Sequence, residues 1–143
     1  MYVYPQKKKK KKKIKPAHIG ISDEFYFKAY RKIDQEKIIK SIKVIFLGFY
    51  FNNKLVGGVS CYKTSQDYYR TRGGWTRPEY RRMGIMSELL LQTEKYALRE
   101  NCKYVWSPCT PEMLQVVLRI GWEVLWDSPS KKYGRYIYAR KRI

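Results

Sequence analysis

The sequence contains few of the residues that bind metals or form disulfide frameworks. It has one histidine, His18, and three cysteines, Cys61, Cys102 and Cys109, none of them in a C-x-x-C pair. This set offers no plausible zinc site. An odd number of cysteines without such spacing is typical of reduced proteins, so we expect a cytoplasmic protein without a metal.

Long apolar segments are also missing. The longest apolar run, residues 44–51, is interrupted by Gly48. It is far shorter than the roughly 20 apolar residues that a membrane-spanning helix needs. The basic N-terminus is not followed by the apolar core of a signal peptide. We therefore expect no membrane span.

Acidic residues are scarce. The chain has 12 Asp and Glu against 31 Lys and Arg, which gives a formal net charge of +19. The seven consecutive lysines that begin at Lys7 and end at Lys13 supply much of this charge, together with Lys15. Because like charges this close repel one another, we expect residues 1–16 to form a flexible basic arm. The arm is either a sequence-independent tether for nucleic acid or another polyanion, or a solubilising tail.

The rest of the chain, residues 17–143, has the composition of one folded domain. Apolar residues make up 44% of the sequence and aromatic residues 16%, which argues against general disorder. A chain of this length can bury a core that is stable alone. We expect a mixed α/β fold, with a mostly antiparallel central sheet of six to seven strands flanked by about four helices.

Capping and periodicity signals predict the first elements. Ser22-Asp23-Glu24 resembles the start of a helix, and Asp34 can cap a second helix that reaches residue 42. Residues 44–51 and 55–63 are rich in strand-forming residues on either side of two asparagines, which is typical of a β-hairpin.

The second half of the chain alternates strands and helices. It is expected to contain a strand at 68–76, a helix at 84–101, a strand at 103–107, a helix opened by Thr110 and Pro111, and final strands at 122–126 and 133–140. Tyr133, Tyr136 and Tyr138 of the last strand lie among many basic residues. They predict either a strand with one packed and one solvated basic face, or a surface on which single-stranded nucleic acid stacks.

A candidate anion site lies between the strand at 68–76 and the helix after it. The first N–H groups of a helix lack partners and carry a partial positive charge, so they attract phosphate oxygens. Gly84 allows backbone amides to approach such an oxygen closely, and Arg81 and Arg82 add positive charge. The same pattern also fits an ordinary basic turn.

The order of residues in this loop carries a family resemblance. Pro78-Glu79-Tyr80-Arg81-Arg82-Met83-Gly84-Ile85 follows a strand, opens an amphipathic helix and resembles the acyl-CoA motif of the GNAT superfamily of N-acetyltransferases. The resemblance extends over most of residues 20–140, including Tyr104-Val105-Trp106 and Ile120-Gly121-Trp122. It implies a GNAT-like acyl-CoA-binding domain over residues 17–143, with acetyl-CoA as co-substrate. The implied reaction moves an acetyl group to a primary amine of a small molecule or protein.

The resemblance also implies which residues hold the cofactor. The family's R/Q-x-x-G-x-G/A loop falls on Arg81, Arg82, Met83, Gly84, Ile85 and Met86, whose amides would hold the pyrophosphate together with Ser87. Trp75 and Thr76, at the end of the preceding strand, would pair with the pantetheine arm. Thr110 stands where the family often has an asparagine. A bound cofactor is expected to separate the strands around Thr76 and Tyr104.

Two positions depart from the family pattern. Met86 replaces the final glycine or alanine of the loop and must point away from the pyrophosphate to avoid crowding it. Val117 takes the place of the tyrosine often proposed to protonate the leaving thiolate. The alternative to an active enzyme is therefore a GNAT-shaped domain that no longer catalyses and acts as a basic binding or assembly module. Small GNAT-like proteins encoded by phages look similar in this respect.

Acetyl transfer to an amine needs a base more than an acid. A lysine-type amine has a pKa of about 10.4 and must lose a proton, whereas a thiolate with a pKa of about 8.5 leaves readily. Candidates for the base are Glu112, Tyr68 and Tyr69. Cys109, just before a helix, is either an acyl-accepting nucleophile or a small packed residue. The positive charge of the domain suits neutral or acidic acceptors better than basic peptides.

Overall fold

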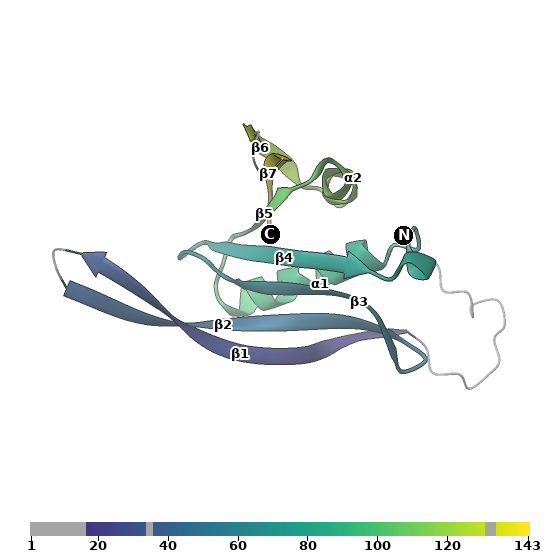
Figure 1. Ribbon diagram of the computed structural model, residues 1–143, viewed down its shortest axis with the longest axis horizontal. Coiled ribbons are helices and arrows are strands. Elements are labelled where there is room, and N and C mark those ends of the chain that lie inside the picture. The colour runs from purple at the N-terminus through teal and green to yellow at the C-terminus, as the bar shows by residue number, and fades with distance from the viewer. Residues whose placement is uncertain (1–16, 34–35, 131–133) are drawn as a thin grey trace.

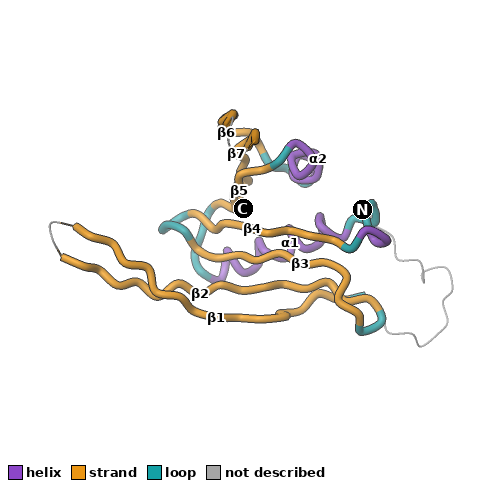
Figure 2. Tube along the Cα trace, in the orientation of Figure 1, coloured by secondary structure: helices purple, strands orange, loops and turns teal. Residues whose placement is uncertain are grey.

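The computed structural model describes residues 17–33, 36–130 and 134–143. The described residues form seven strands, two α-helices and one 3-10 helix (Figures 1 and 2). In chain order these are β1 (His18–Ile33), β2 (Glu36–Phe51), β3 (Lys54–Lys63), β4 (Tyr68–Thr76), η2 (Pro78–Tyr80), α1 (Ile85–Arg99), β5 (Tyr104–Cys109), α2 (Pro111–Arg119), β6 (Glu123–Ser130) and β7 (Gly134–Arg142). The predicted mixed α/β fold with six to seven strands is confirmed.

The N-terminal part of the sheet corrects the sequence prediction. Of the segments expected as two helices, residues 22–33 belong to β1 and residues 36–42 to β2, which pair antiparallel from His18 with Tyr50 to Ile33 with Glu36. Asp34, the expected cap of the second helix, lies outside the described residues. The described residues therefore contain two α-helices rather than about four. Both segments are rich in aromatic and β-branched residues, and such side chains favour a pleated pair. Pairing between the two strands outweighs the helical spacing of the apolar residues.

The sheet is antiparallel except at one junction. Its strand order is β1-β2-β3-β4-β5-β7-β6, and β4 and β5 are the parallel neighbours. These two strands pair only through Tyr68 with Tyr104, Tyr69 with Val105 and Arg70 with Trp106. Beyond these pairs β5 turns away from β4 (Figure 1). The sheet therefore opens after Trp106, and not around Tyr104, which is still paired.

Both helices cover the same face of the sheet. Helix α1 packs against β3 and β4, and α2 packs against β5 and β7. Leu89 of α1 and Val117 of α2 share one core with Val105 and Ala139 of the sheet. Since side chains alternate along a strand, Trp106 and Tyr138 lie on the opposite face, which no described helix covers.

The described residues contain no helix long and apolar enough to cross a membrane. Nor do they contain a group of three His, Cys, Asp or Glu side chains placed to hold a metal ion. The three cysteines are free and buried. The lysine run from Lys7 to Lys13 lies outside the described residues.

Candidate active site

A cavity of about 550 Å³ lies between the end of β4, the loop before α1 and the start of α2. It contains nine of the ten residues expected to bind the cofactor: Trp75, Thr76, Arg81, Arg82, Gly84, Ile85, Met86, Ser87 and Thr110. The tenth, Met83, instead packs against the core. Three arginines line the cavity, Arg119 of α2 being the third, against one acidic residue, Glu112. The cavity is therefore suited to an anionic ligand.

The loop before α1 has the backbone geometry of an anion site. Gly84 is the N-cap of α1 with φ of 78°, and no side chain caps this helix end. The first N–H groups of the helix are thus left without a side-chain acceptor, and the helix dipole adds positive potential there. Arg82 also has a positive φ, 63°. That conformation costs a residue with a Cβ about 1–2 kcal/mol, so this arginine occupies a backbone position that favours glycine.

Two arginines brace the loop against the sheet. Arg81 donates through Nε to the carbonyl oxygen of Thr76 at 3.3 Å. Arg77 donates through Nε to the carbonyl oxygen of Leu55 at 2.8 Å. Since Arg81 and Arg82 are both exposed at the rim of the cavity, their charges are available to a ligand.

Met86 lies against β4 rather than over the loop. A Cβ built on Gly74 would be only 2.9 Å from Met86 Cε and 3.3 Å from Met113 Cε. The methionine thus fills the space beside a glycine of β4, next to Met113 of α2. It lines the first cavity and narrows the gap between β4 and α2.

Two further cavities continue the first one through the opening of the sheet. The second, about 320 Å³, shares Gly74, Met86, Thr110 and Met113 with the first. The third, about 390 Å³, shares Arg72, Ser107 and Tyr136 with the second. A path therefore runs between β4 and β5 from the helix-covered face to the open face.

The candidates for the base are far apart. Glu112 is exposed in the first turn of α2 and lines the first cavity. Tyr68 stands at the start of β4, where its hydroxyl accepts a hydrogen bond from Arg140 and its ring stacks on Tyr104 at 4.9 Å. Seven residues along a strand correspond to about 23 Å, so Tyr68 is far from Trp75 at the cavity. The structure brings Glu112, but not Tyr68, together with the loop.

Tyr69 and Cys109 are also unsuited to proton or acyl transfer. Tyr69 is buried, and burial, with the nearby Cys61 as the next cause, raises its pKa. Cys109 is 1% exposed, and burial raises the pKa of its thiol to about 11. Because a thiol is nucleophilic as the thiolate, Cys109 fits the packed role of the two considered. Thr110 caps α2 by accepting a hydrogen bond at 3.3 Å from the Met113 amide.

Tyr136 is a site residue that the sequence did not assign. Val117, at the position where the resemblance expects a tyrosine, is 1% exposed and lines the second cavity without offering a hydroxyl. Tyr136 of β7 lines the second and third cavities and is 38% exposed. Tyr136 is far from the loop in sequence, so no local motif assigned it to the site. Only the position of β7 between β5 and β6 brings it to the opening.

A match to the sequence model of a protein family shows to which family the chain belongs. Residues 15–117, well over half of the chain, match the acetyltransferase (GNAT) family. The chain belongs to this family. A comparison with curated protein sequences finds no match.

Solved structures share the GNAT fold of this chain at low sequence identity. Nourseothricin acetyltransferase is 10% identical with a TM-score of 0.68, over 90% of this chain and 99% of that protein. A GNAT acetyltransferase from Elizabethkingia anophelis, with acetyl-CoA bound, is 12% identical with a TM-score of 0.64, over 70% of this chain and 76% of that one. An aminoglycoside 6'-N-acetyltransferase complexed with coenzyme A is 11% identical with a TM-score of 0.61, over 69% and 72%. The GNAT resemblance stated from the sequence is confirmed.

Proposed function

We propose that this GNAT domain, residues 17–143, is an N-acetyltransferase that moves an acetyl group from acetyl-CoA to a primary amine. The observation that carries the proposal is the continuity of the three cavities. The first is bounded by the cationic loop and the N-terminus of α1, and the path continues through the opening between β4 and β5. A phosphate-rich cofactor with a long thin arm fits this succession of spaces. The acetyl-CoA bound to the similarly folded E. anophelis protein supports the same ligand.

The cofactor's parts can be assigned to the chain's residues. The pyrophosphate contacts the first amides of α1 and the charges of Arg81 and Arg82. The pantetheine arm lies along Trp75 and Thr76, which use one edge of β4 to pair with β3 and leave the other toward the opening. The thioester then reaches the second cavity.

The opening offers a backbone group for the developing oxyanion. Gly58 pairs with Trp75 and Ser60 with Arg72, so Gly73 and Gly74 oppose one residue of β3 in a β-bulge. A bulge leaves a residue outside the ladder, and an unpaired N–H aimed at the thioester oxygen stabilises the charge that forms when the amine attacks.

The residues at the opening suggest how protons move. The amine nitrogen bonds to the carbonyl carbon, the carbon–sulfur bond breaks, and the thiolate of coenzyme A leaves. We assign protonation of this thiolate to Tyr136, the phenol that lines the second cavity. Glu112, the candidate base that lines the first cavity, accepts the amine proton through a chain of waters along the path. Arg70 and Arg72 line the third cavity, so the acceptor is neutral or anionic.

Calorimetric titration with acetyl-CoA at two salt concentrations tests the cofactor, with ADP as the control. We expect acetyl-CoA to bind more tightly than ADP at both salts, because only acetyl-CoA uses the path beyond the loop. Equal heats for the two ligands, or heat that vanishes at the higher salt, would indicate unspecific anion capture and refute the proposal. Release of the free thiol in the presence of a panel of neutral and anionic amines then measures transfer.

A second candidate is a GNAT domain that binds acetyl-CoA without turnover and serves as a basic binding module. The position of Met86 across the path and the absence of a hydroxyl at Val117 favour it. Acetyl-CoA binding with no thiol release for any amine would support this candidate over the enzyme. Nucleic acid or another polyanion is its natural partner, through the lysines from Lys7 to Lys13. A chain without residues 1–15 should then bind DNA and RNA more weakly.

A further inference from the structure

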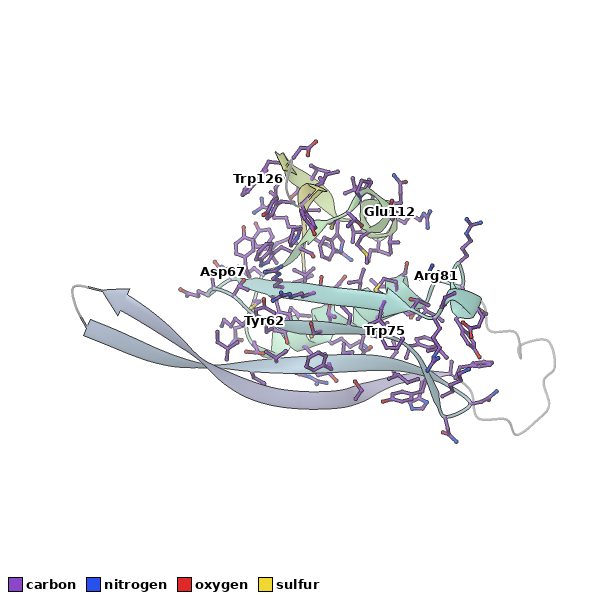
Figure 3. All side chains as sticks on the ribbon, viewed as in Figure 1. Tyr62, Asp67, Trp75, Arg81, Glu112 and Trp126 are labelled. Atoms are coloured by element: carbon purple, nitrogen blue, oxygen red, sulfur yellow. The ribbon has the colours of Figure 1, made fainter. Side chains whose placement is uncertain are left out.

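The face of the sheet opposite the two helices carries a row of aromatic and arginine side chains. On β7, Lys141 bonds to Glu94 of α1 at 2.8 Å, which places the alternate residues of this strand on the other face. Trp126 of β6 and Glu112 of α2 lie on opposite sides of the β5–β7 ribbon (Figure 3). We call this surface the aromatic–arginine face: Arg70, Tyr104, Trp106, Trp126, Tyr138 and Arg142.

The side chains of this face form a continuous row across four strands. Trp126 of β6 packs on Tyr138 of β7 with ring centroids 4.6 Å apart, and Tyr138 lies at 6.4 Å from Trp106 of β5. The guanidinium of Arg70, on β4, stands 5.3 Å above the Trp106 ring. Arg142 stands at the same distance above Tyr104. Three aromatic rings thus follow one another from β6 to β5, and fixed positive charges stand over Trp106 and Tyr104.

This row contains features that a merely solvated basic face would not need. Trp126 is 57% exposed, so its ring is open to a partner. Arg140 of β7 pairs with Glu123 at 3.3 Å, but neither Arg70 nor Arg142 has a carboxylate partner among the residues that the structure describes. The Nε of Arg70 is buried and has no acceptor there. A buried donor without an acceptor is costly, which is unusual for a merely solvated basic face.

We propose that the aromatic–arginine face binds single-stranded nucleic acid, with bases stacking on Trp126 and Tyr138 and phosphates contacting Arg70 and Arg142. Aromatic platforms combined with a cationic groove are the means by which proteins hold single strands without reading sequence. From β4 to β6 the row spans three inter-strand gaps, about 14 Å. That length accommodates roughly four stacked bases at a spacing of about 3.4 Å. The net charge of +19 supplies the long-range attraction.

The proposed binding is independent of acetyl transfer. Arg70 and Tyr138 also line the third cavity, so a bound strand lies beside the proposed acceptor entrance. No residue of the face lines the first cavity, and binding requires no acetyl-CoA. An inactive enzyme could therefore still bind, and an active one could fail to do so.

The test measures the fluorescence anisotropy of a labelled 12-nucleotide single strand with the full-length chain. Inorganic polyphosphate and phosphatidylserine vesicles are the comparison ligands. Trp126→Ala should weaken binding of the single strand about tenfold, because one stacking platform is lost. It should leave polyphosphate binding unchanged. Trp75→Ala, which removes an exposed tryptophan from the cofactor cavity instead, is the matched control and should leave single-strand binding unchanged.

A second pair of variants tests the phosphate contacts. Arg142→Gln should weaken single-strand binding and reduce its salt dependence by about one charge. Arg99→Gln is the control. It removes an equal charge from the exposed side of α1, where Arg99 also stands over an aromatic ring, and it should have less effect on single-strand binding. The proposal is overturned if Trp126→Ala and Arg142→Gln bind the single strand like the unaltered chain. It is equally overturned if both variants lose polyphosphate or vesicle binding in the same proportion.

Discussion

The position of Met86 leads to a specific prediction about the path of the cofactor. Its side chain lies beside Gly74, where Cε and Sδ would be 2.9 and 3.1 Å from a Cβ at that position. Together with Met113 it lines both the first and the second cavity, so it stands on the path that we propose for the pantetheine arm and is expected to move when the arm binds. Holding a side chain off its preferred rotamer costs about 0.5–1.5 kcal/mol. Met86→Ala removes the obstructing atoms and should therefore tighten acetyl-CoA binding by about two- to tenfold.

The assay is calorimetric titration of Met86→Ala with acetyl-CoA and with ADP. The gain should appear for acetyl-CoA alone, because ADP ends at the loop and never enters the gap. Met83→Ala is the matched control, since Met83 belongs to the same loop but packs against the core and does not line the cavity. The free energy of unfolding of Met86→Ala should fall by about 1–2 kcal/mol, less than for a fully buried methionine.

Two results would refute this account of Met86. Equal tightening for ADP and acetyl-CoA would mean that the substitution acts on the loop rather than on the path. Weaker acetyl-CoA binding in a variant that still melts cooperatively would mean that Met86 is a binding contact for the pantetheine arm.

The remaining predictions concern the loop, the proton donor and the cysteines. Arg82→Gly should raise the free energy of unfolding by about 0.5–1 kcal/mol in urea denaturation, because φ of 63° is strained for arginine; Arg81→Gly, at φ of −70°, should lower it instead. Tyr136→Phe should reduce kcat by about tenfold to a hundredfold without changing KM for acetyl-CoA, whereas Tyr104→Phe, which lines none of the three cavities, should leave turnover intact; equal losses would contradict the assignment. Cys109 should resist a thiol reagent at pH 8 until urea is added, since burial raises its pKa from 9.0 to about 11. The neutral thiol stabilises the fold fully below pH 9.0, and this stabilisation should be lost as the pH rises toward 11. A pH-independent free energy of unfolding across that interval would be the contrary result.

Local signals were sufficient for the parts of the fold where one segment determines its own structure. The Thr110-Pro111 start of α2 and the loop that ends at Gly84 depend on caps and turn geometry, which neighbouring residues set. The prediction of two helices between residues 22 and 42 was wrong. The apolar spacing of this stretch fits a helix, while its aromatic and β-branched residues fit a strand. The partner strand decided between them, and the partner is not visible in a local pattern.

The residues of the candidate site likewise divide into those that a local motif could locate and those whose place depends on the strand order. Trp75, Thr76 and the loop from Arg81 to Ser87 are close in sequence, so one motif located them together. Tyr68, a candidate for the base, belongs to the same strand as Trp75 and Thr76 but stands at its other end. A strand rises by about 3.3 Å per residue, however, and therefore separates its two ends widely. Tyr136 comes from β7, and only the strand order brings it to the opening.

The gap between β4 and β5 also results from particular residues, whose effect depends on the strand order. Gly73 has φ of 67°, which takes β4 out of regular strand geometry just after its last pairs with β5. Across the gap, Pro108 of β5 has no N–H to donate to a ladder. A glycine bulge on one strand facing a proline on the next prevents the parallel pair from continuing. These residues of the chain therefore produce the gap between β4 and β5 themselves. A cofactor would find the path through the sheet already open, except where Met86 narrows it.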